Sequence, residues 1–178
     1  MWTYNFKIYL FLSFTSTALA GRENSVSSCV LDGYEDDFKL EPFTKVGKHF
    51  YYFGQTKVTW YKAFLICRSL GGFLASLESQ EELNAISNYL IANYPLDRWW
   101  WLSGSDVDSE GNFYCYNTGE RMKFFDWSEG QPDNYGEEHC VHLWFIKTKY
   151  QMNDWWCTRA AYYICKATKP KTIVLSVY

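Results

Sequence analysis

The sequence predicts an α+β fold in which two helices are followed by short antiparallel sheets and one long loop, with disulfides as staples. Apolar residues recur at helical spacing only in the first half, within residues 60–70 and 83–90. The second half has short runs of β-forming residues and a polar loop, residues 126–139, long enough to be functional or disordered. The 178 residues suffice for one domain, and six cysteines are available for the staples.

Residues 1–20 are expected to be a signal peptide. Lys7 gives a weakly positive start, an apolar run begins at Ile8, and Ala18-Leu19-Ala20 fits the small-x-small cleavage pattern. The run is too short to cross a bilayer of about 30 Å. We therefore expect a secreted, extracellular protein without membrane insertion. A net charge of −3 gives no electrostatic basis for binding nucleic acid.

Residues 21–42 have little periodicity and are predicted to be an N-terminal arm. A hairpin is expected across Phe43–Phe53, with Gly47 at its turn. The first helix should begin after Thr59, its N-cap, and end at Gly71-Gly72.

The second helix should begin after Ser79 and stop before Pro95. Ser79-Gln80-Glu81-Glu82 has the spacing of a capping box, which predicts that the Glu82 side chain reaches back to the Ser79 amide.

Short strands are expected from Trp99 onward. Trp99–Leu102 should be a buried strand, with Trp100 exposed or covered by the arm, because neighbouring strand residues face opposite sides. In the tail, residues 167–178, the run Thr172–Leu175 predicts an added strand or an edge for self-association. The other predicted strands are Asn112–Tyr116, Met122–Phe125 (joined to it by a turn at Asn117–Gly119), Cys140–Ile146 and one within residues 155–166.

A series of motifs occurs in a fixed order along the chain. They are Trp60, Cys67, Gly72-Phe73-Leu74-Ala75, Trp101-Leu102-Ser103-Gly104, Gln131-Pro132-Asp133, Glu138-His139-Cys140, Met152-Asn153-Asp154, Cys157 and Cys165. With these motifs, residues 43–166 resemble a C-type lectin domain, and the whole chain resembles the secreted single-domain lectins of insects. The match departs from the family at Met152, where a tryptophan is usual.

The resemblance implies two disulfides, Cys67–Cys165 and Cys140–Cys157. Cys29 and Cys115 lie outside the family's pattern. The even number of cysteines favours a Cys29–Cys115 bond, and an interchain bond through Cys29 is the alternative.

The resemblance also implies one calcium site in the long loop, with a cis peptide bond before Pro132. Oxygen donors of this kind suit Ca²⁺. The Gln-Pro-Asp order goes with galactose-type sugars in the family, and Tyr135 would present an aromatic face to the sugar. Only Tyr135-Gly136-Glu137 stands where galactose-binding members have a Gly-rich insert. The implied calcium ligands, which would also contact the sugar, are Gln131, Asp133, Glu138, Asn153 and Asp154.

A second calcium position of the family matches Asp106, Glu110 and Asn134, with His139 in place of the usual acid. Imidazole nitrogen is a poor ligand for a hard cation, so we expect His139 to weaken this site. Zinc held by His139 with His142 is not expected, because Cys140 between them is used in a disulfide.

The resulting hypothesis is a calcium-dependent lectin for galactose-type glycans or glycoproteins on microbial or cell surfaces, with a role in innate immunity. Self-association into a homo-oligomer would strengthen its binding. The alternative is a protein-interaction module that keeps the fold without binding sugar. An enzyme is not expected: two loop acids could form a glycosidase pair, but these acids match calcium ligands.

Overall fold

The computed structural model describes residues 26–32, 40–168 and 171–177 of the chain. The expected signal peptide lies outside these residues. The chain divides into two compact units, and the larger is Asp32–Pro170. Within the described residues, no helix is long and apolar enough to cross a membrane.

The smaller unit contains a two-stranded sheet made by β1 (Val26–Asp32) and β11 (Lys171–Val177). β11 confirms that the run Thr172–Leu175 adds a strand. β1 lies in the segment predicted to be an arm without periodicity, so this part of the arm has regular structure. The arm boundary at residue 42 stays a prediction.

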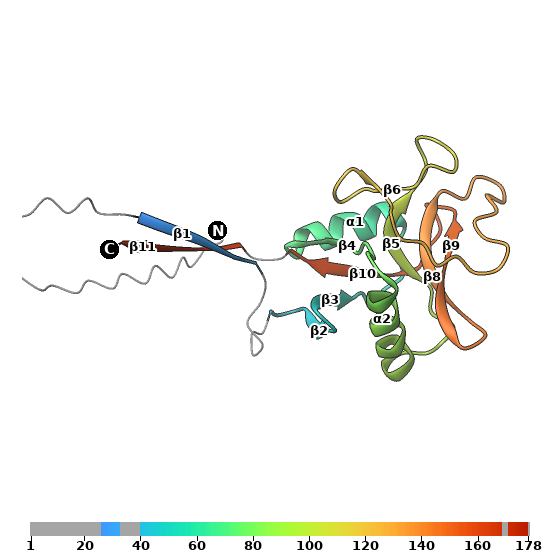
Figure 1. Ribbon diagram of the computed structural model, residues 1–178. Helices are drawn as coiled ribbons and strands as arrows, with labels where there is room; N and C mark the ends of the chain where they lie inside the picture. Colours follow the sequence, from blue (N-terminus) through green and yellow to red (C-terminus); the bar gives the residue numbers. More distant parts are fainter. Residues whose placement is uncertain (1–25, 33–39, 169–170, 178) are drawn as a thin grey trace, which may run out of the picture. The chain divides into compact units, whose positions relative to one another are not determined.

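Two helices and nine strands make up residues 40–168 (Figure 1). The helices are α1 (Trp60–Ser69) and α2 (Gln80–Asn93). The strands are β2 (Thr44–Val46), β3 (His49–Phe53), β4 (Gly72–Leu74), β5 (Trp100–Ser105), β6 (Tyr114–Cys115), β7 (Glu120–Arg121), β8 (Cys140–Ile146), β9 (Lys149–Trp155) and β10 (Tyr162–Ala167). These elements confirm the predicted α+β class.

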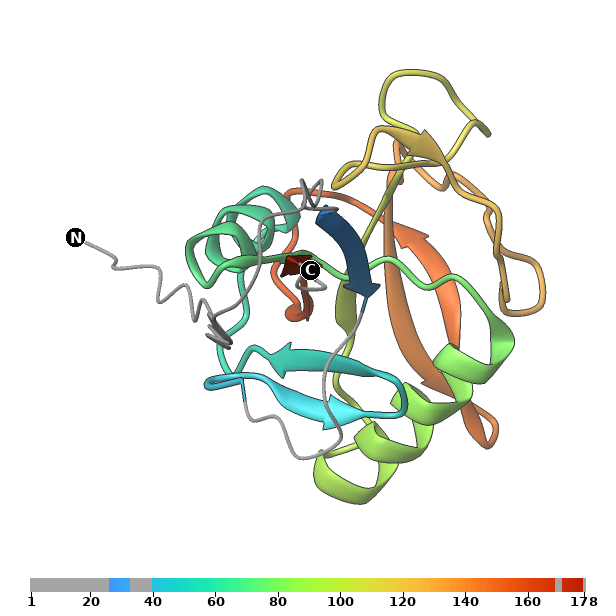
Figure 2. The same ribbon diagram turned by 60° about the vertical axis from the view of Figure 1, so that its left-hand side comes forward.

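The strands of residues 40–168 form one mixed sheet with the order β2-β3-β10-β5-β6-β7. β4 also pairs with β10, and the β8–β9 hairpin pairs with β5 through β8 (Figure 2). The β10–β5 pair is parallel, unlike the antiparallel pairs expected throughout. The connection between these two strands includes β6 to β9, and such a long crossover is what a parallel pair requires.

Both helix starts agree with the sequence. The Thr59 side chain accepts a hydrogen bond from the Lys62 amide at 3.4 Å, and Ser79 accepts from the Glu82 amide at 3.2 Å. The Cys67–Cys165 disulfide links α1 to β10, as implied.

The second half of the predicted capping box is wrong. The Glu82 carboxylate accepts from the Glu78 amide at 2.9 Å and from the Tyr51 hydroxyl, and lies 2.8 Å from Lys166 Nζ. Lys166 belongs to β10, so its buried charge draws Glu82 into the domain instead of back toward Ser79.

The central strand β5 is buried on both faces. Trp100 lies in one hydrophobic cluster with Phe53 and Leu90, and Trp101 lies in another with Trp60 and Cys67. Both indoles have 0% exposure, so the expectation that Trp100 is exposed or covered by the arm is wrong. A strand with packing layers on both faces buries neighbouring residues alike.

Among the strands, β7 and β9 depart most from the prediction. β7 comprises Glu120–Arg121 and precedes the predicted Met122–Phe125, because a tight turn at Gly119 (φ +73°) brings Glu120 directly opposite Cys115. β9 follows β8 through a turn with Lys147 at φ +57° and was not predicted, because this turn has no glycine, asparagine or proline to mark it.

Cys115 forms no disulfide with any described residue, and the expected Cys29–Cys115 bond stays a prediction. Cys115 is half-buried in β6, where it lines a pocket with Ser76 and Glu78. The side chain of Cys29 lies outside the described residues.

Candidate functional site

The β8–β9 hairpin supplies the rigid side of the candidate site. Asn153 and Asp154 occupy β9 opposite His142 and Val141 of β8, and both side chains are buried. The Cys140–Cys157 disulfide, with its Cα atoms 5.2 Å apart, joins the start of β8 to the segment after β9. This staple confirms the implied pairing and fixes the end of the long loop next to Asp154.

The long loop folds back onto Asp154. The backbone amides of Asp133 and Asn134 donate to the two carboxylate oxygens of Asp154, at 3.3 Å and 2.9 Å. The Gln131–Pro132 peptide bond is cis, as the resemblance implies. The Asn134 Oδ1 accepts from the Glu138 amide at 3.0 Å, which keeps Glu138 beside the turn.

Three carboxylates converge at this point. Oxygens of Asp133, Glu138 and Asp154 lie within 4.8 Å of one another. Burial, together with repulsion from Asp154 and Asp133, raises the pKa of Glu138 to about 7. Burial also raises the pKa of Asp154. Two of the three acids are buried, and a cation between them would relieve the repulsion that raises the pKa of Glu138.

Two amide oxygens beside these carboxylates are buried and accept no hydrogen bond from any described residue: Gln131 Oε1 and Asn153 Oδ1. Their amide nitrogens are engaged. Gln131 Nε2 donates to Asp133 at 3.2 Å, and Asn153 Nδ2 lies 3.1 Å from His142 Nε2. Buried oxygens without donors are costly unless a cation or a ligand satisfies them. Three carboxylates and two amide oxygens form a donor set that fits Ca²⁺.

An aromatic pair flanks the carboxylates. Tyr135 is 73% exposed, and its ring meets that of Trp156 edge to face at 6.1 Å. The Trp156 indole N–H donates to the Gly136 carbonyl, and the Arg159 guanidinium lies 5.6 Å from the Trp156 ring centre. Sequence reasoning missed Trp156. The available signal was its place between Asp154 and Cys157, inside the stapled segment.

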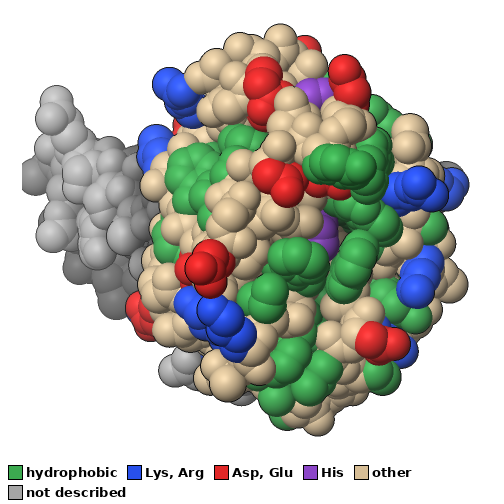
Figure 3. All heavy atoms as spheres, turned by 90° about the vertical axis from the view of Figure 1, so that its right-hand side faces the viewer, with side chains coloured by type: hydrophobic (Ala, Val, Ile, Leu, Met, Phe, Trp, Pro, Cys, Tyr) green, Lys and Arg blue, Asp and Glu red, His purple; other side chains and the backbone are tan. Residues whose placement is uncertain are grey.

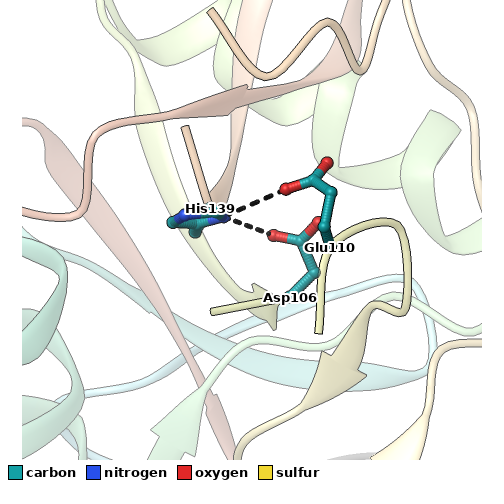
Figure 4. A group of neighbouring side chains, drawn as sticks. All are labelled: Asp106, Glu110 and His139. Atoms are coloured by element: carbon teal, nitrogen blue, oxygen red, sulfur yellow. Dashed lines mark hydrogen bonds and ion pairs between the residues drawn. The ribbon is translucent and has the colours of Figure 1, made fainter. Parts of the chain in front are cut away.

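A second cluster lies nearby, formed by Asp106, Glu110 and His139 (Figure 4). His139 Nδ1 is 3.1 Å from Asp106 and 3.5 Å from Glu110. Burial opposes the charged imidazolium, but hydrogen bonds to Asp106 and Glu137 raise the pKa of His139 above its ordinary value. The structure thus brings together three of the four residues at the expected second calcium position, and adds Glu137, which the sequence did not indicate.

Figure 3 shows the face of the molecule at the β8–β9 side. Acidic side chains and histidine lie close together there, beside a group of hydrophobic side chains. This face therefore carries acidic and hydrophobic side chains next to one another.

Comparison with known proteins agrees with this architecture. A family model described as the Lectin C-type domain matches residues 56–167. The chain is 37% identical over 147 residues to C-type lectin 37Da of Drosophila melanogaster, covering 78% of each chain.

Among solved structures, C-type lectin CEL-I from Cucumaria echinata aligns with a TM-score of 0.66 and 26% identity, over 73% of this chain and 97% of that one. A calcium-independent type II antifreeze protein aligns with a TM-score of 0.60 and 23% identity, over 73% and 94%, which shows the fold alone.

The family model covers more than half of the chain, and the Drosophila lectin is a relative along most of its length. These relatives are carbohydrate-binding proteins and not enzymes, and they support a lectin role for this chain. The chain belongs to the C-type lectin family.

Proposed function

We propose that this protein is a secreted lectin that binds galactose-type glycans through one calcium ion. The observation that carries the proposal is the pair of buried amide oxygens, Gln131 Oε1 and Asn153 Oδ1, without donors and next to three converging carboxylates. If the loop bound no ion, the two amide oxygens would be buried without hydrogen-bond donors. The three carboxylates would repel one another without a cation between them. The proposed ligands are Gln131, Asp133, Glu138, Asn153 and Asp154.

When bound, the calcium ion supplies open coordination positions for two neighbouring sugar hydroxyls. The chain's own residues would orient these hydroxyls: carboxylates such as Asp133 and Glu138 accept hydrogen bonds from them, and the Gln131 and Asn153 amide N–H groups donate hydrogen bonds to their oxygens. Because an amide comes first and an acid second in Gln131-Pro132-Asp133, we assign the site to galactose-type sugars and not to mannose-type sugars.

Tyr135 supports the same sugar class. Its ring is exposed beside Asp133 and is held by contact with Trp156. An aromatic face at this position can pack against the apolar C–H face of a galactose ring.

The competing function is a protein-interaction module without sugar or calcium. The likeness to a calcium-independent antifreeze protein favours it, because the same fold exists without the ion. The complete set of five oxygen donors favours the lectin.

Retention on immobilised galactose in the presence of calcium tests the proposal. The wild-type protein should be retained, released by a calcium chelator, and pass through a mannose column. Asp133→Ala should abolish retention, and Asp108→Ala, which removes an exposed acid outside the site, should not. Folded wild-type protein that flows through with calcium present would refute the proposal.

A double variant tests the sugar class separately. Gln131→Glu combined with Asp133→Asn reverses the order of amide and acid and keeps the number of oxygens. Retention should move from galactose to mannose. A double variant that still prefers galactose would show that the order of these two residues does not set specificity.

Secretion and self-association belong to the same proposal. One monosaccharide site is weak, so several sites on one assembly would give useful avidity on a glycan-rich cell or microbial surface. Light scattering of the protein recovered from culture medium tests both points. Protein that stays inside the cells, or that is monomeric, contradicts the corresponding part.

A further inference from the structure

The cluster of Asp106, Glu110 and His139 has a donor set unlike that of the calcium site. Two carboxylate oxygens face an imidazole nitrogen, and these atoms lie within 4.8 Å of one another (Figure 4). The acids come from the loop after β5, and the histidine directly precedes β8. The side chain of Asp106 has 0% exposure, that of His139 18%, and that of Glu110 56%, so the cluster has a buried floor and one open side.

Hydrogen bonds to the backbone fix the position of Asp106. Its Oδ2 accepts from the Gly111 amide at 2.8 Å, and its own amide donates to the His139 carbonyl at 3.2 Å. This leaves Oδ1 directed at His139 Nδ1. The loop that carries Glu110 is therefore closed around the cluster by two hydrogen bonds.

Two of the three separations between donors are close to those around a small ion with four ligands. Donors that lie 2.0–2.1 Å from a tetrahedral zinc ion are separated by about 3.3 to 3.4 Å. His139 Nδ1 lies 3.1 Å from the Asp106 oxygen and 3.5 Å from the Glu110 oxygen, on either side of that value.

A fourth residue orients the imidazole. Glu137 Oε2 lies 3.5 Å from His139 Nε2, on the opposite side of the ring from Asp106 and Glu110. A carboxylate on the distal nitrogen is the usual outer partner of a metal-binding histidine, because it holds that proton and leaves the other nitrogen's lone pair free. The Glu137 side chain is 88% exposed, so it reaches the histidine from the solvent side of the cluster.

We propose that Asp106, Glu110 and His139 bind a zinc ion, with Glu137 as the outer partner of the histidine and water at the open side. Nitrogen together with carboxylate oxygen suits zinc and similar transition ions, whereas calcium prefers oxygen alone. The site is separate from the calcium site, although His139 directly follows Glu138 in the chain.

Titration with zinc chloride, followed by calorimetry in saturating calcium, tests the proposal. The protein should carry Cys115→Ser, so that a thiol at Cys115 cannot bind zinc. We expect one zinc equivalent, lost in His139→Gln and in Glu110→Gln. Glu137→Gln should weaken binding by about 10- to 100-fold, as outer partners do.

Three controls separate the outcomes. His49→Gln removes another histidine and should bind zinc normally. Asp133→Asn disrupts the proposed calcium site and should also retain zinc. Cobalt should give the strong visible absorption of a four-coordinate ion, and His139→Gln should abolish it.

Zinc binding that persists in both His139→Gln and Glu110→Gln places the ion elsewhere and overturns the proposal. A wild-type protein that binds neither zinc nor cobalt overturns the proposal equally. Since Glu110 is largely exposed, its variant should fold even if that of His139 does not.

Discussion

The Trp156 ring meets the Tyr135 ring edge to face, with centroids 6.1 Å apart, and its indole N–H donates to the carbonyl oxygen of Gly136. These two contacts hold an exposed part of the loop against the segment that ends at the disulfide-bonded Cys157. The exposed tyrosine is thus backed by a second ring and is not an isolated surface residue.

Tyr135→Ala should weaken galactose binding about fivefold, because an aromatic contact of this kind contributes about 1 kcal/mol. Trp156→Phe should weaken binding less, since it keeps the ring and removes only the hydrogen bond to Gly136. Calorimetric titration with galactose measures both. Tyr61→Ala, an exposed tyrosine on α1, is the matched control. Equal affinity in Tyr135→Ala and wild type would remove Tyr135 from the site.

Calcium should raise the melting temperature. An ion that binds only the folded state adds about 2.7 kcal/mol to the free energy of unfolding at about 100 times its Kd. Scanning calorimetry with calcium and with a chelator measures the shift, and Asp133→Ala should abolish it. An unchanged melting temperature in the wild type would favour the interaction module that lacks calcium.

We expect loss of one disulfide to affect mainly stability and loss of the other to affect mainly calcium binding. Chain entropy predicts about 4.7 kcal/mol for Cys67–Cys165 and about 3 kcal/mol for Cys140–Cys157, because they are separated by 98 and 17 residues. Replacing the first pair by serine should therefore cost more stability, whereas replacing the second should cost more calcium affinity, since it lies beside Asp154. Urea unfolding and calcium titration of both variants check this. The reverse order of calcium affinities would argue against the role given to the second staple.

Glu82 should make stability depend on pH. Burial opposes its charge, but Lys166 and Tyr51 lower its pKa below the ordinary value of 4.5. Its contribution is therefore complete above pH 4.5 and is lost as the pH falls through the lowered pKa. Glu82→Gln should lose about 3 kcal/mol at pH 7, because Lys166 is left buried without its counter-ion, and less at low pH. Urea unfolding at both pH values measures this, with exposed Glu81→Gln as control. A loss that does not shrink in acid would contradict the assignment.

Cys115 should react with a thiol reagent without prior reduction, but slowly, because burial raises its pKa. Mass spectrometry of the folded, alkylated protein measures the label on Cys115. An unlabelled Cys115 that becomes labelled only after reduction would show that the residue is in a disulfide.

The parts of the fold set by local chemistry could be predicted. Thr59 and Ser79 cap helices through bonds to residues three positions on, and Gly47 turns a hairpin, so each signal lies within a few residues. The turn at Lys147 was not predicted, because its positive φ is imposed by the pairing of β8 with β9 and not by the residue type.

The errors concern contacts between distant segments. Glu82 turns to Lys166, 84 positions away by their residue numbers, and nothing near Glu82 reveals this. Trp100 is buried because layers from other parts of the chain cover both faces of β5. In the site, the order of the motifs indicated the resemblance to the family. Trp156 and Glu137 could be assigned to the site only from the contacts that they make in the folded loop.

The position of β10 has a consequence for how the molecule is made. β10 is the last strand of the lectin domain, and it pairs with β3, β4 and β5 at once. A chain emerging from the ribosome cannot close this sheet until residue 167 is available, and Cys67 cannot reach its partner sooner. The domain therefore cannot fold completely until its last strand, β10, has been synthesised. A truncation before Tyr162 would remove the middle of the sheet and not its margin.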